Sequence, residues 1–276
     1  MAMAARGRTA LVTGSTDGVG RAAATMLGRE GFHVLVHGRD RQRGEAVVAD
    51  IVAASGAAEF LPADLASLAD VRRLATAVQE KADRLDILIN NAGIGTAGAE
   101  RQTSADGYEL RFAVNYLASF LLTRLLLPLL RRSAAARIVN VSSGGQQAID
   151  FDDVMLTRGY SGGRAYCQSK LAQILFTFDL AEELAGTGIT ATCLHPATYM
   201  DTTMVRRAGV KPWSSVAEGA EAIMNLALSP SLQGRSGLYF NGMNEAQPNP
   251  QAFDLDARRR LRTLSLELTD LAGQVT

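Results

Sequence analysis

Tyr166 and Lys170 are the two residues whose types and spacing best suit proton transfer. Residues four apart share one face of a helix, so a phenol and an ammonium group would lie side by side. A phenol has an ordinary pKa of about 10 and is a poor base at neutral pH, but a neighbouring positive charge favours the phenolate and lowers that pKa. We therefore expect Tyr166 to give or take a proton in general acid–base catalysis. The pair alone also fits an ordinary amphipathic helix.

Two serines, Ser142 and Ser143, follow the apolar run 137–141 and could supply a hydroxyl to the same reaction. Such a hydroxyl can hydrogen-bond a substrate oxygen and stabilise the charge that develops there. Because successive side chains of a strand point to opposite faces, only one of the two can face a cleft. The serines could equally cap a turn, and their types alone leave the choice open.

A glycine-rich segment, residues 13–20, lies between an expected strand and an expected helix. Gly14 permits a tight turn, Gly18 lets the backbone approach a pyrophosphate, and Gly20 lets the helix pack closely on the strand. The free N–H groups at the start of that helix favour phosphate. The segment predicts a dinucleotide site, although any α/β protein can contain such a turn. The predicted contacts are Gly14, Ser15, Thr16, Asp17, Gly18, Val19 and Gly20.

The end of the second expected strand, His37-Gly38-Arg39-Asp40, bears on the choice between NAD and NADP. An acidic residue at this place favours the free ribose of NAD, whereas an arginine accommodates the 2′-phosphate of NADP. Gly38 is not acidic, and Arg39 can bind a phosphate with its forked guanidinium. We assign Asp40 to the cap of the next helix. The sequence therefore favours NADP(H) over NAD(H).

The elements that must position these residues alternate between apolar β-branched runs and segments of helical period. This alternation predicts a doubly wound, Rossmann-type α/β fold: one domain over residues 1–276, with a mainly parallel seven-stranded sheet and helices on both faces. The expected strands are Ala10–Val12, His33–Val36, Glu59–Leu61, Ile87–Ile89, Arg137–Val141, Ile189–Leu194 and Gly237–Phe240. The expected helices are Val19–Glu30, Gln42–Ala54, Leu68–Ala82, Ala105–Phe112, Asn115–Arg132, Gly163–Ala185, Val216–Leu228 and Ala257–Leu268.

Composition narrows the class of partner. The chain has 28 basic and 28 acidic residues, so no overall field draws it to nucleic acid or to acidic membranes, and we expect a small-molecule partner. Its two cysteines and three histidines are scattered without metal-ligand spacing, so we expect no metal. Arg124 and Pro128 interrupt the longest apolar run, and the first residues lack a signal-peptide pattern. We therefore expect a cytoplasmic protein without a membrane contact.

Several of these motifs occur together in family order. Asn90-Asn91-Ala92-Gly93, Asn115, Ser142-Ser143 and the Tyr166–Lys170 pair, behind the glycine loop, resemble the short-chain dehydrogenase/reductase family from Thr9 to about Leu271. The stretches 165–172 and 236–240 resemble its branch of retinol dehydrogenases and WW-domain oxidoreductases. We expect the chain to lack that branch's membrane anchor and WW domains and to be similar to its free-standing bacterial relatives.

The resemblance implies a catalytic set of Asn115, Ser143, Tyr166 and Lys170. It favours the second serine, assigns Lys170 also to the nicotinamide ribose, and makes Asn115 the anchor of a water relay. Asp64 matches the family's adenine contact, although a helix cap is an equal alternative. Thr202 matches a contact to the nicotinamide carboxamide, but Thr198 fits as well. The further cofactor contacts implied are Leu65, Asn91, Ala92, Gly93 and Pro196.

The activity implied is hydride transfer between nicotinamide and a ketone, aldehyde or secondary alcohol. We expect the substrate to be an apolar small molecule, held by the segment 94–99 and by loops at 144–162 and 198–214. The apolar residues expected to line its pocket are Ile94, Met155, Met200, Met204 and Trp213. One alternative is a tailoring ketoreductase or epimerase acting on a polycyclic or polyketide-like substrate. Another is a dinucleotide-sensing module without catalysis, against which the proton-transfer residues argue.

Two long leucine-containing helices, Asn115–Arg132 and Gly163–Ala185, suggest self-association. Leucines beyond those needed to cover the sheet would form an outer apolar face. Members of the family commonly pair these two helices across a two-fold axis, which implies a homodimer or homotetramer. The neighbouring Arg131 and Arg132 argue against burial at such an axis.

Overall fold

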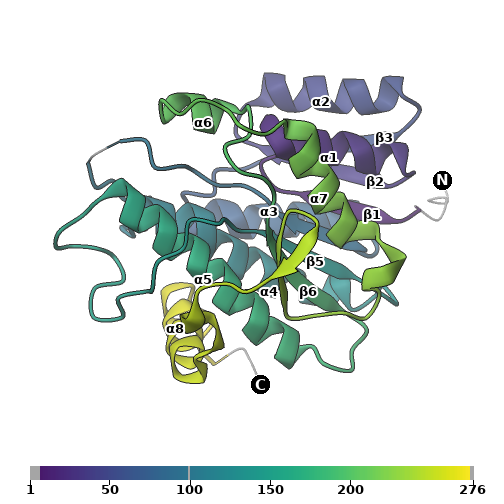
Figure 1. Ribbon diagram of the computed structural model, residues 1–276. Helices are drawn as coiled ribbons and strands as arrows, with labels where there is room; N and C mark the ends of the chain where they lie inside the picture. The colour runs from purple at the N-terminus through teal and green to yellow at the C-terminus, as the bar shows by residue number, and fades with distance from the viewer. Residues whose placement is uncertain (1–6, 99, 274–276) are drawn as a thin grey trace.

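A twisted sheet of eight strands runs through the centre of the molecule, in the order β3-β2-β1-β4-β5-β6-β7-β8 (Figure 1). The computed structural model describes residues 7–98 and 100–273. Strands β1 to β7 run parallel, and β8 pairs antiparallel with β7. The strands are β1 (Thr9–Val12), β2 (His33–Gly38), β3 (Ala57–Pro62), β4 (Ile87–Asn90), β5 (Arg137–Val141), β6 (Thr190–His195), β7 (Leu238–Asn241) and β8 (Asn244–Ala246). The predicted α/β fold is confirmed, with one strand more than expected.

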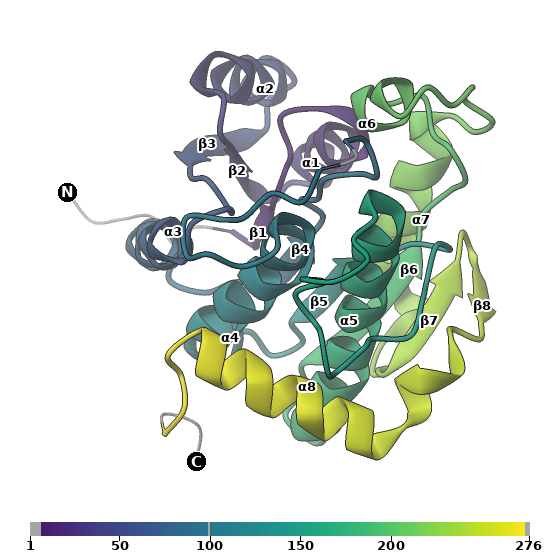
Figure 2. The ribbon, with the colours of Figure 1, turned by 90° about the vertical axis from the view of Figure 1, so that its left-hand side faces the viewer.

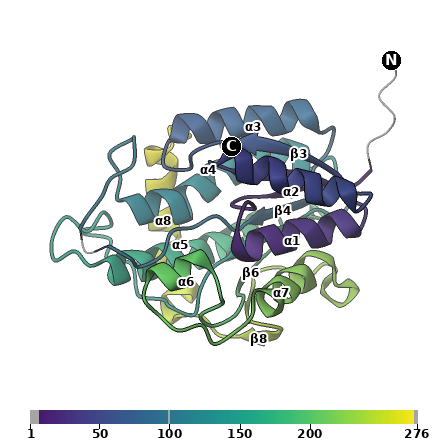
Figure 3. The same ribbon diagram turned by 90° about the horizontal axis from the view of Figure 1, so that it is seen from above.

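Helices cover both faces of this sheet (Figure 3). One face carries α1 (Gly18–Arg29), α2 (Arg41–Ala53) and α7 (Val216–Leu228). The other carries α3 (Leu68–Lys81), α4 (Ala118–Leu130) and α5 (Gly162–Glu183). The remaining helical segments are α6 (Thr203–Arg207), α8 (Leu255–Leu268), a π-helix (Phe112–Leu117) and two 3₁₀ turns (Pro230–Leu232 and Pro250–Phe253).

The central strands are buried along their whole length. Every residue of β1 and β4 is buried, because a sheet covered on both faces needs apolar side chains at successive positions rather than at alternate ones. The strand order reverses between β1 and β4. The carboxyl ends of these two strands therefore border the crevice in which such folds bind their ligands.

Three segments differ from the sequence prediction. Strand β8 has only three residues, two of them polar, and has no apolar pattern to reveal it. The helix expected over Ala105–Phe112 is instead a turn, in which Gly107 has a φ of +85° and Thr103 pairs with Glu109. The short helix α6 forms within a segment that we expected to be loop.

One helical stretch of the described chain, Phe112–Leu130, is long and apolar enough to cross a membrane by length and composition. The expectation that Arg124 and Pro128 rule out such a stretch was therefore wrong. In this fold 83% of the stretch is buried. Arg124 is accommodated because its guanidinium binds the carboxylate of Glu183 on α5, at 2.5 Å.

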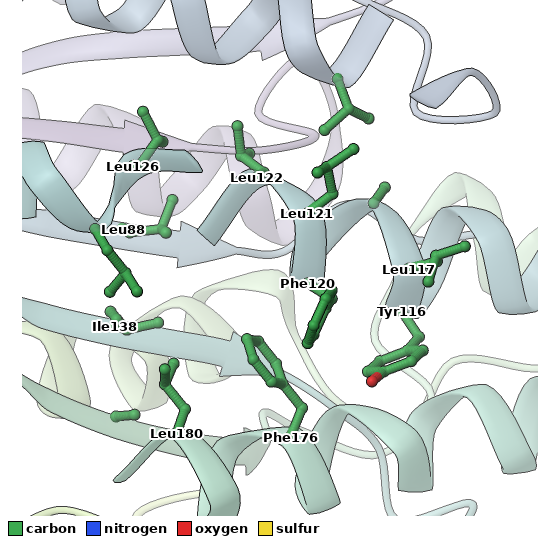
Figure 4. Packing of buried hydrophobic residues seen from close by; sticks show 14 of the residues in the cluster. Leu88, Tyr116, Leu117, Phe120, Leu121, Leu122, Leu126, Ile138, Phe176 and Leu180 are labelled. Carbon is green, nitrogen blue, oxygen red and sulfur yellow. The ribbon is translucent and has the colours of Figure 1, made fainter. Parts of the chain in front are cut away.

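Aromatic side chains fill the space between this stretch and α5 (Figure 4). Tyr116 and Phe120 both pack against Phe176, with ring centroids 6.3 and 5.2 Å apart. Each such ring buries a large apolar area, so this cluster fixes α5 against the neighbouring helix.

The C-terminal helix α8 crosses the outer side of α4 and α5 (Figure 2). Leu261 of α8 is buried in this contact, and the hydroxyls of Tyr116 and Ser265 are 2.6 Å apart. Of the leucines expected to form an outer face, Leu121, Leu129, Leu171 and Leu175 are buried within the chain, and Leu125 is partly buried. The homodimer or homotetramer stays a prediction.

Charged side chains hold α8 on this surface. Asp179 of α5 is 6% exposed and accepts a hydrogen bond from Arg262 of α8 at 2.7 Å. Arg258, also 6% exposed, lies 3.9 Å from Asp179 and 2.6 Å from Glu182. Burial raises the pKa of Asp179, and the arginines of α8 oppose this shift.

We predict that Asp179→Ala lowers the free energy of unfolding by about 1.5–3 kcal/mol, because Arg262 loses the charged acceptor of its hydrogen bond and Arg258 keeps only Glu182. Arg259→Ala is the matched control, since Arg259 pairs with Asp256 on the exposed side of the same helix. Its effect should stay within about 0.5 kcal/mol. Urea denaturation measures the free energy of unfolding of both variants. Equal losses of stability in the two would contradict the role of Asp179 in holding α8.

Candidate active site

Tyr166 and Ser143 meet where β5 ends and α5 begins. Ser161 caps α5 by accepting a hydrogen bond from the N–H of Arg164, which sets Tyr166 in the first turns of the helix. A Cβ atom on Gly145 would lie 3.5 Å from the Ser143 Oγ and 3.7 Å from the Tyr166 Cε1, so the two side chains are close together. Ser142 points the other way, and its hydroxyl donates to the carbonyl of Lys170 at 2.8 Å. Ser143 is therefore the serine beside Tyr166.

Burial dominates the acidity of Tyr166. It raises the pKa of the phenol, and the neighbouring Ser143 side chain lowers it in part. We expected a lowered pKa from the charge of Lys170. In this structure the Lys170 Nζ lies 5.9 Å from the centroid of the Tyr166 ring and does not contribute to the shift. The phenol is thus held in its protonated form.

Lys170 is deeply buried beneath the tyrosine. Its Nζ donates to the carbonyl of Val141 at 2.8 Å and to the Gln173 Oε1 at 2.9 Å. Burial lowers the pKa of Lys170 from 10.5 to about 7. A lysine with this pKa gains or loses its proton near physiological pH, which suits a site that moves protons.

Asn115 connects α5 to the loop after β4. Its Oδ1 accepts from the N–H of Ile94 at 2.8 Å, and its Nδ2 donates to the Ile94 carbonyl and to the Ser169 hydroxyl. It lies in the π-helix Phe112–Leu117, a distortion that is frequent at functional sites. A Cβ atom on Gly93 would lie 3.2 Å from the Asn115 Oδ1 and 3.4 Å from the Lys170 Nζ. The three residues therefore line one confined space.

The glycine loop needs its glycines for different reasons. Gly14 and Gly18 have φ values of +65° and +53°, which only glycine adopts without strain. A Cβ atom on Gly14 would lie 2.8 Å from the Ala92 Cα. Gly20 was expected to permit packing on the strand, but a Cβ there would collide with the Asn91 side chain and the Gly14 carbonyl. Gly20 thus packs the loop against the segment after β4.

Several residues predicted to contact the cofactor form hydrogen bonds within the protein instead. The Ser15 hydroxyl donates to the Val12 carbonyl, and the Asn91 Nδ2 donates to the carbonyls of Thr13 and Gly14. The N–H of Ala92 donates to the Thr13 hydroxyl. These contacts shape the crevice, and Ser15 is fully buried.

Leu65 and Val19 are core residues, with 5% and 9% exposure, so only their backbones could reach a cofactor. Asp64 does not cap a helix, because Ser67 caps α3. The Asp64 carboxylate instead accepts from the N–H of Ala66 at 3.0 Å and remains half exposed. The helix-cap alternative for Asp64 is removed.

A cavity of about 240 Å³ lies beside the start of α1. Its lining residues are Thr16, Asp17, Arg21, Arg43, Ala46 and Thr203. Arg39, the expected phosphate ligand, is 70% exposed with its Nη1 3.9 Å from the Asp64 carboxylate. Arg43, in the first turn of α2, has its Nη1 3.9 Å from the Asp17 carboxylate, and no sequence pattern distinguished it from the neighbouring arginines.

The two candidate threonines lie in different places. Thr198 is 3.1 Å from the His195 Nε2, just beyond Pro196. Thr202 caps α6, and a Cβ on Gly18 would lie 3.2 Å from its methyl group. The next residue, Thr203, donates from its hydroxyl to the Asp17 carboxylate at 2.7 Å. This bond, which the sequence did not suggest, ties α6 to the glycine loop.

The apolar residues expected to line a substrate pocket lie in different parts of the structure. Ile94, Met155 and Met200 pack against the two cores of the protein. Met204 reaches the site's edge, where a Cβ on Gly95 would lie 2.7 Å from its Cγ. Trp213 points away from the protein and is 76% exposed. Trp213 is therefore a surface residue rather than part of an enclosed pocket.

Comparison with known proteins gives close relatives over almost the whole chain. The family model for short chain dehydrogenases matches residues 8–212. Human retinol dehydrogenase 13 is 39% identical over 96% of this chain and 85% of its own length. Mouse polyprenol dehydrogenase is 40% identical over 97% of this chain and 85% of its own length.

These relatives contradict the expected cytoplasmic location. The retinol and polyprenol dehydrogenases are membrane-associated, whereas Phe112–Leu130, although long and apolar enough for a membrane span, is mostly buried in this fold. The sequence argument failed because it tested only one apolar run and one region for a leader. A local feature can bind a membrane whatever the net charge of the whole chain, so the balanced charge could not decide the location.

A solved structure shows the same fold with a cofactor in place. The landomycin C-6 ketoreductase LanV, with bound NADP and rabelomycin, has a TM-score of 0.69 and is 29% identical, over 86% of this chain and 95% of its own. The sheet order, the glycine loop and the Ser143–Tyr166 pair agree with the family match. The chain belongs to the short-chain dehydrogenase/reductase family.

Proposed function

We propose that this nicotinamide-dependent oxidoreductase uses NADP(H) to interconvert a ketone or aldehyde and the corresponding alcohol of an apolar small molecule, with Tyr166 as the proton-transfer residue. The observation that carries the proposal is that the side chains of Tyr166 and Ser143 lie together beside Gly145 at the carboxyl edge of the sheet. Both hydroxyls can bind one substrate oxygen there, next to the crevice of the fold.

The protein's part in reduction follows from these two hydroxyls. The bound nicotinamide supplies the hydride in reduction and accepts it in oxidation. Tyr166 donates its proton to the substrate oxygen as negative charge develops there, and its raised pKa keeps that proton available at neutral pH. Ser143 donates a second hydrogen bond to the same oxygen.

Lys170 and Asn115 position the groups that react. Both border the space in front of Gly93, where a Cβ atom would leave no room. We assign Lys170 to the nicotinamide ribose and to the proton supply of Tyr166, for which a pKa of about 7 is suitable. Asn115 holds the loop after β4 in place through Ile94 and can order a water molecule beside Lys170.

The residues around α1 fit a dinucleotide. Gly14 and Gly18 turn the chain with positive φ values, and α1 begins at Gly18, so the N–H groups of its first turn can meet a phosphate. The nearby cavity contains two guanidinium groups, Arg21 and Arg43. We assign the 2′-phosphate of NADP to Arg39 and Arg43, the adenine to Asp64 and the backbone of Leu65, and the nicotinamide carboxamide to Thr202.

The substrate side is proposed for the loops 144–162 and 198–214, which flank the same edge of the sheet. Its expected apolar character agrees with the names of the retinol and polyprenol dehydrogenases. A second candidate function, reduction of a polycyclic ketone, is supported by the likeness to LanV. Oxidation of NADPH, followed against retinaldehyde, a long-chain polyprenal and polycyclic ketones, distinguishes the two.

The first prediction concerns the proton donor. Tyr166→Phe should lower turnover by about two to four powers of ten and leave the dissociation constant of NADPH nearly unchanged, because only proton transfer is lost. Tyr108→Phe is the control, since it removes a hydroxyl that binds the Leu268 carbonyl far from the site. Normal turnover in Tyr166→Phe would refute the assignment.

The second concerns the cofactor phosphate. Arg39→Ala and Arg43→Ala should each raise the dissociation constant of NADPH by about one to two powers of ten, with little effect on NADH, because each removes a charge-assisted hydrogen bond. Arg41→Ala is the control, because Arg41 is 69% exposed and pairs with Glu45 on α2. Fluorescence titration gives the constants, and a wild-type preference for NADH would overturn the choice of NADP.

The third concerns the ionisation of Lys170. Its pKa is depressed from 10.5 to about 7 on folding, so the unfolded chain binds more protons between these values and stability rises with pH. From pH 6 to pH 9 this group should add about 2–3 kcal/mol to the free energy of unfolding, and Lys170→Met should lack this increment. Parallel stability curves for wild type and variant would show that Lys170 has an ordinary pKa.

A further inference from the structure

An exposed aromatic pair stands on the loop over the proposed site. Trp213 is 76% exposed and Tyr199 is 46% exposed, and their rings meet edge to face with centroids 5.4 Å apart. Large aromatic side chains are normally withdrawn from water. The loop from Tyr199 to Ser214, here called the aromatic loop, therefore presents an apolar surface outward.

The backbone holds this pair in a fixed arrangement. The N–H of Trp213 donates to the Tyr199 carbonyl at 3.0 Å, and the N–H of Asp201 donates to the Ser214 carbonyl at 3.1 Å. Tyr199 has a φ of +45°, an unfavourable conformation for a residue other than glycine. The closed base of the loop thus maintains a strained conformation, in which the two rings stand together at the surface.

Positive charge accompanies the aromatic pair. The aromatic loop contains Arg206, Arg207 and Lys211 but only one acidic residue, Asp201, which binds Arg206 at 2.8 Å. Arg207 and Lys211 are exposed and form no ion pair with any residue in the described part of the chain. Exposed aromatic rings flanked by unpaired cations match the interfacial zone of a membrane that contains anionic lipid.

The loop also lies at the entrance to the site. Thr203 binds Asp17 of the glycine loop, and Met204 packs against Gly95 beyond β4. Figure 2 shows α6 next to the start of α1, on the edge of the sheet where the site lies. A surface bound to the outside of the aromatic loop would therefore lie close to the substrate entrance.

We propose that the aromatic loop docks this enzyme on an anionic phospholipid surface, with Trp213 and Tyr199 in the interfacial layer and Arg207 and Lys211 against the headgroups. Docking would let an apolar substrate pass from the bilayer into the site without crossing water. This role in substrate access rests on the proposed function, whereas the docking itself requires no turnover.

Trp213 is the only tryptophan in the sequence, so its fluorescence reports on this loop alone. We expect its emission to shift to the blue with vesicles of phosphatidylcholine and phosphatidylserine, and lipids brominated near the headgroup end of the acyl chain to quench it. Vesicles of phosphatidylcholine alone, or high salt, should weaken both effects because the attraction is partly electrostatic. Unchanged emission with anionic vesicles would overturn the proposal.

Co-sedimentation with the same vesicles tests the residues separately. Trp213→Ala should lower the partition constant at least about tenfold, and Arg207→Gln with Lys211→Gln should lower it by about fivefold for each charge removed. Leu255→Ala is the control, since Leu255 is equally apolar and 56% exposed on α8. Equal binding by Trp213→Ala and Leu255→Ala would refute the docking surface.

Two other outcomes would also overturn it. A blue shift that grows with protein concentration without lipid, accompanied by a doubled mass in light scattering, would assign the loop to a second copy of this chain. A shift produced by NADPH alone would assign it to closure over the cofactor. Because vesicle binding is measured without substrate, failure of docking and failure of the proposed reaction are read in separate assays.

Discussion

The burial of one ammonium group, that of Lys170, constrains the organisation of the site. A buried cation is stable only if protein atoms replace its water, and the Val141 carbonyl and the Gln173 side chain do so. Because one partner lies on β5 and the other on α5, the lysine fixes the helix against the end of the strand. Tyr166, four residues earlier on α5, is thereby set next to Ser143.

The same requirement explains the depressed pKa of Lys170 and the raised pKa of Tyr166. Both groups are removed from water, and desolvation favours the neutral form of each. A neutral phenol is a proton donor, which suits reduction of a carbonyl. Burial of these residues therefore sets the protonation state in which Tyr166 meets a carbonyl substrate.

Residues whose role depends on local spacing were predictable from the sequence. The glycine loop follows from its place between a strand and a helix, and the pairing of Tyr166 with Lys170 follows from helical geometry. Roles set by distant partners were not predictable. Strand alternation could not decide between Ser142 and Ser143, because the decision rests on a hydrogen bond to the Lys170 carbonyl.

Longer-range packing limited the remaining predictions in the same way. Leucines of α4 and α5 suggested an outer apolar face, but most of them are buried within the chain, and α8 packs on α5 beside Asp179 and Arg258. Trp213 was expected to line a pocket, and only the folded loop shows that it faces outward. The predicted location in the cell was corrected by the relatives, because the overall charge balance does not reveal a local membrane contact.

The central claim is that this protein transfers a hydride, and isotope transfer tests it most directly. Retinaldehyde is incubated with the enzyme and NADPH carrying deuterium at the transferable position of the nicotinamide. We predict that mass spectrometry finds one deuterium on the carbinol carbon of the alcohol product, and that cofactor labelled on the opposite face delivers none. If NADPH binds but no deuterium reaches retinaldehyde or any other apolar ketone or aldehyde, the chain senses the dinucleotide and is not a reductase.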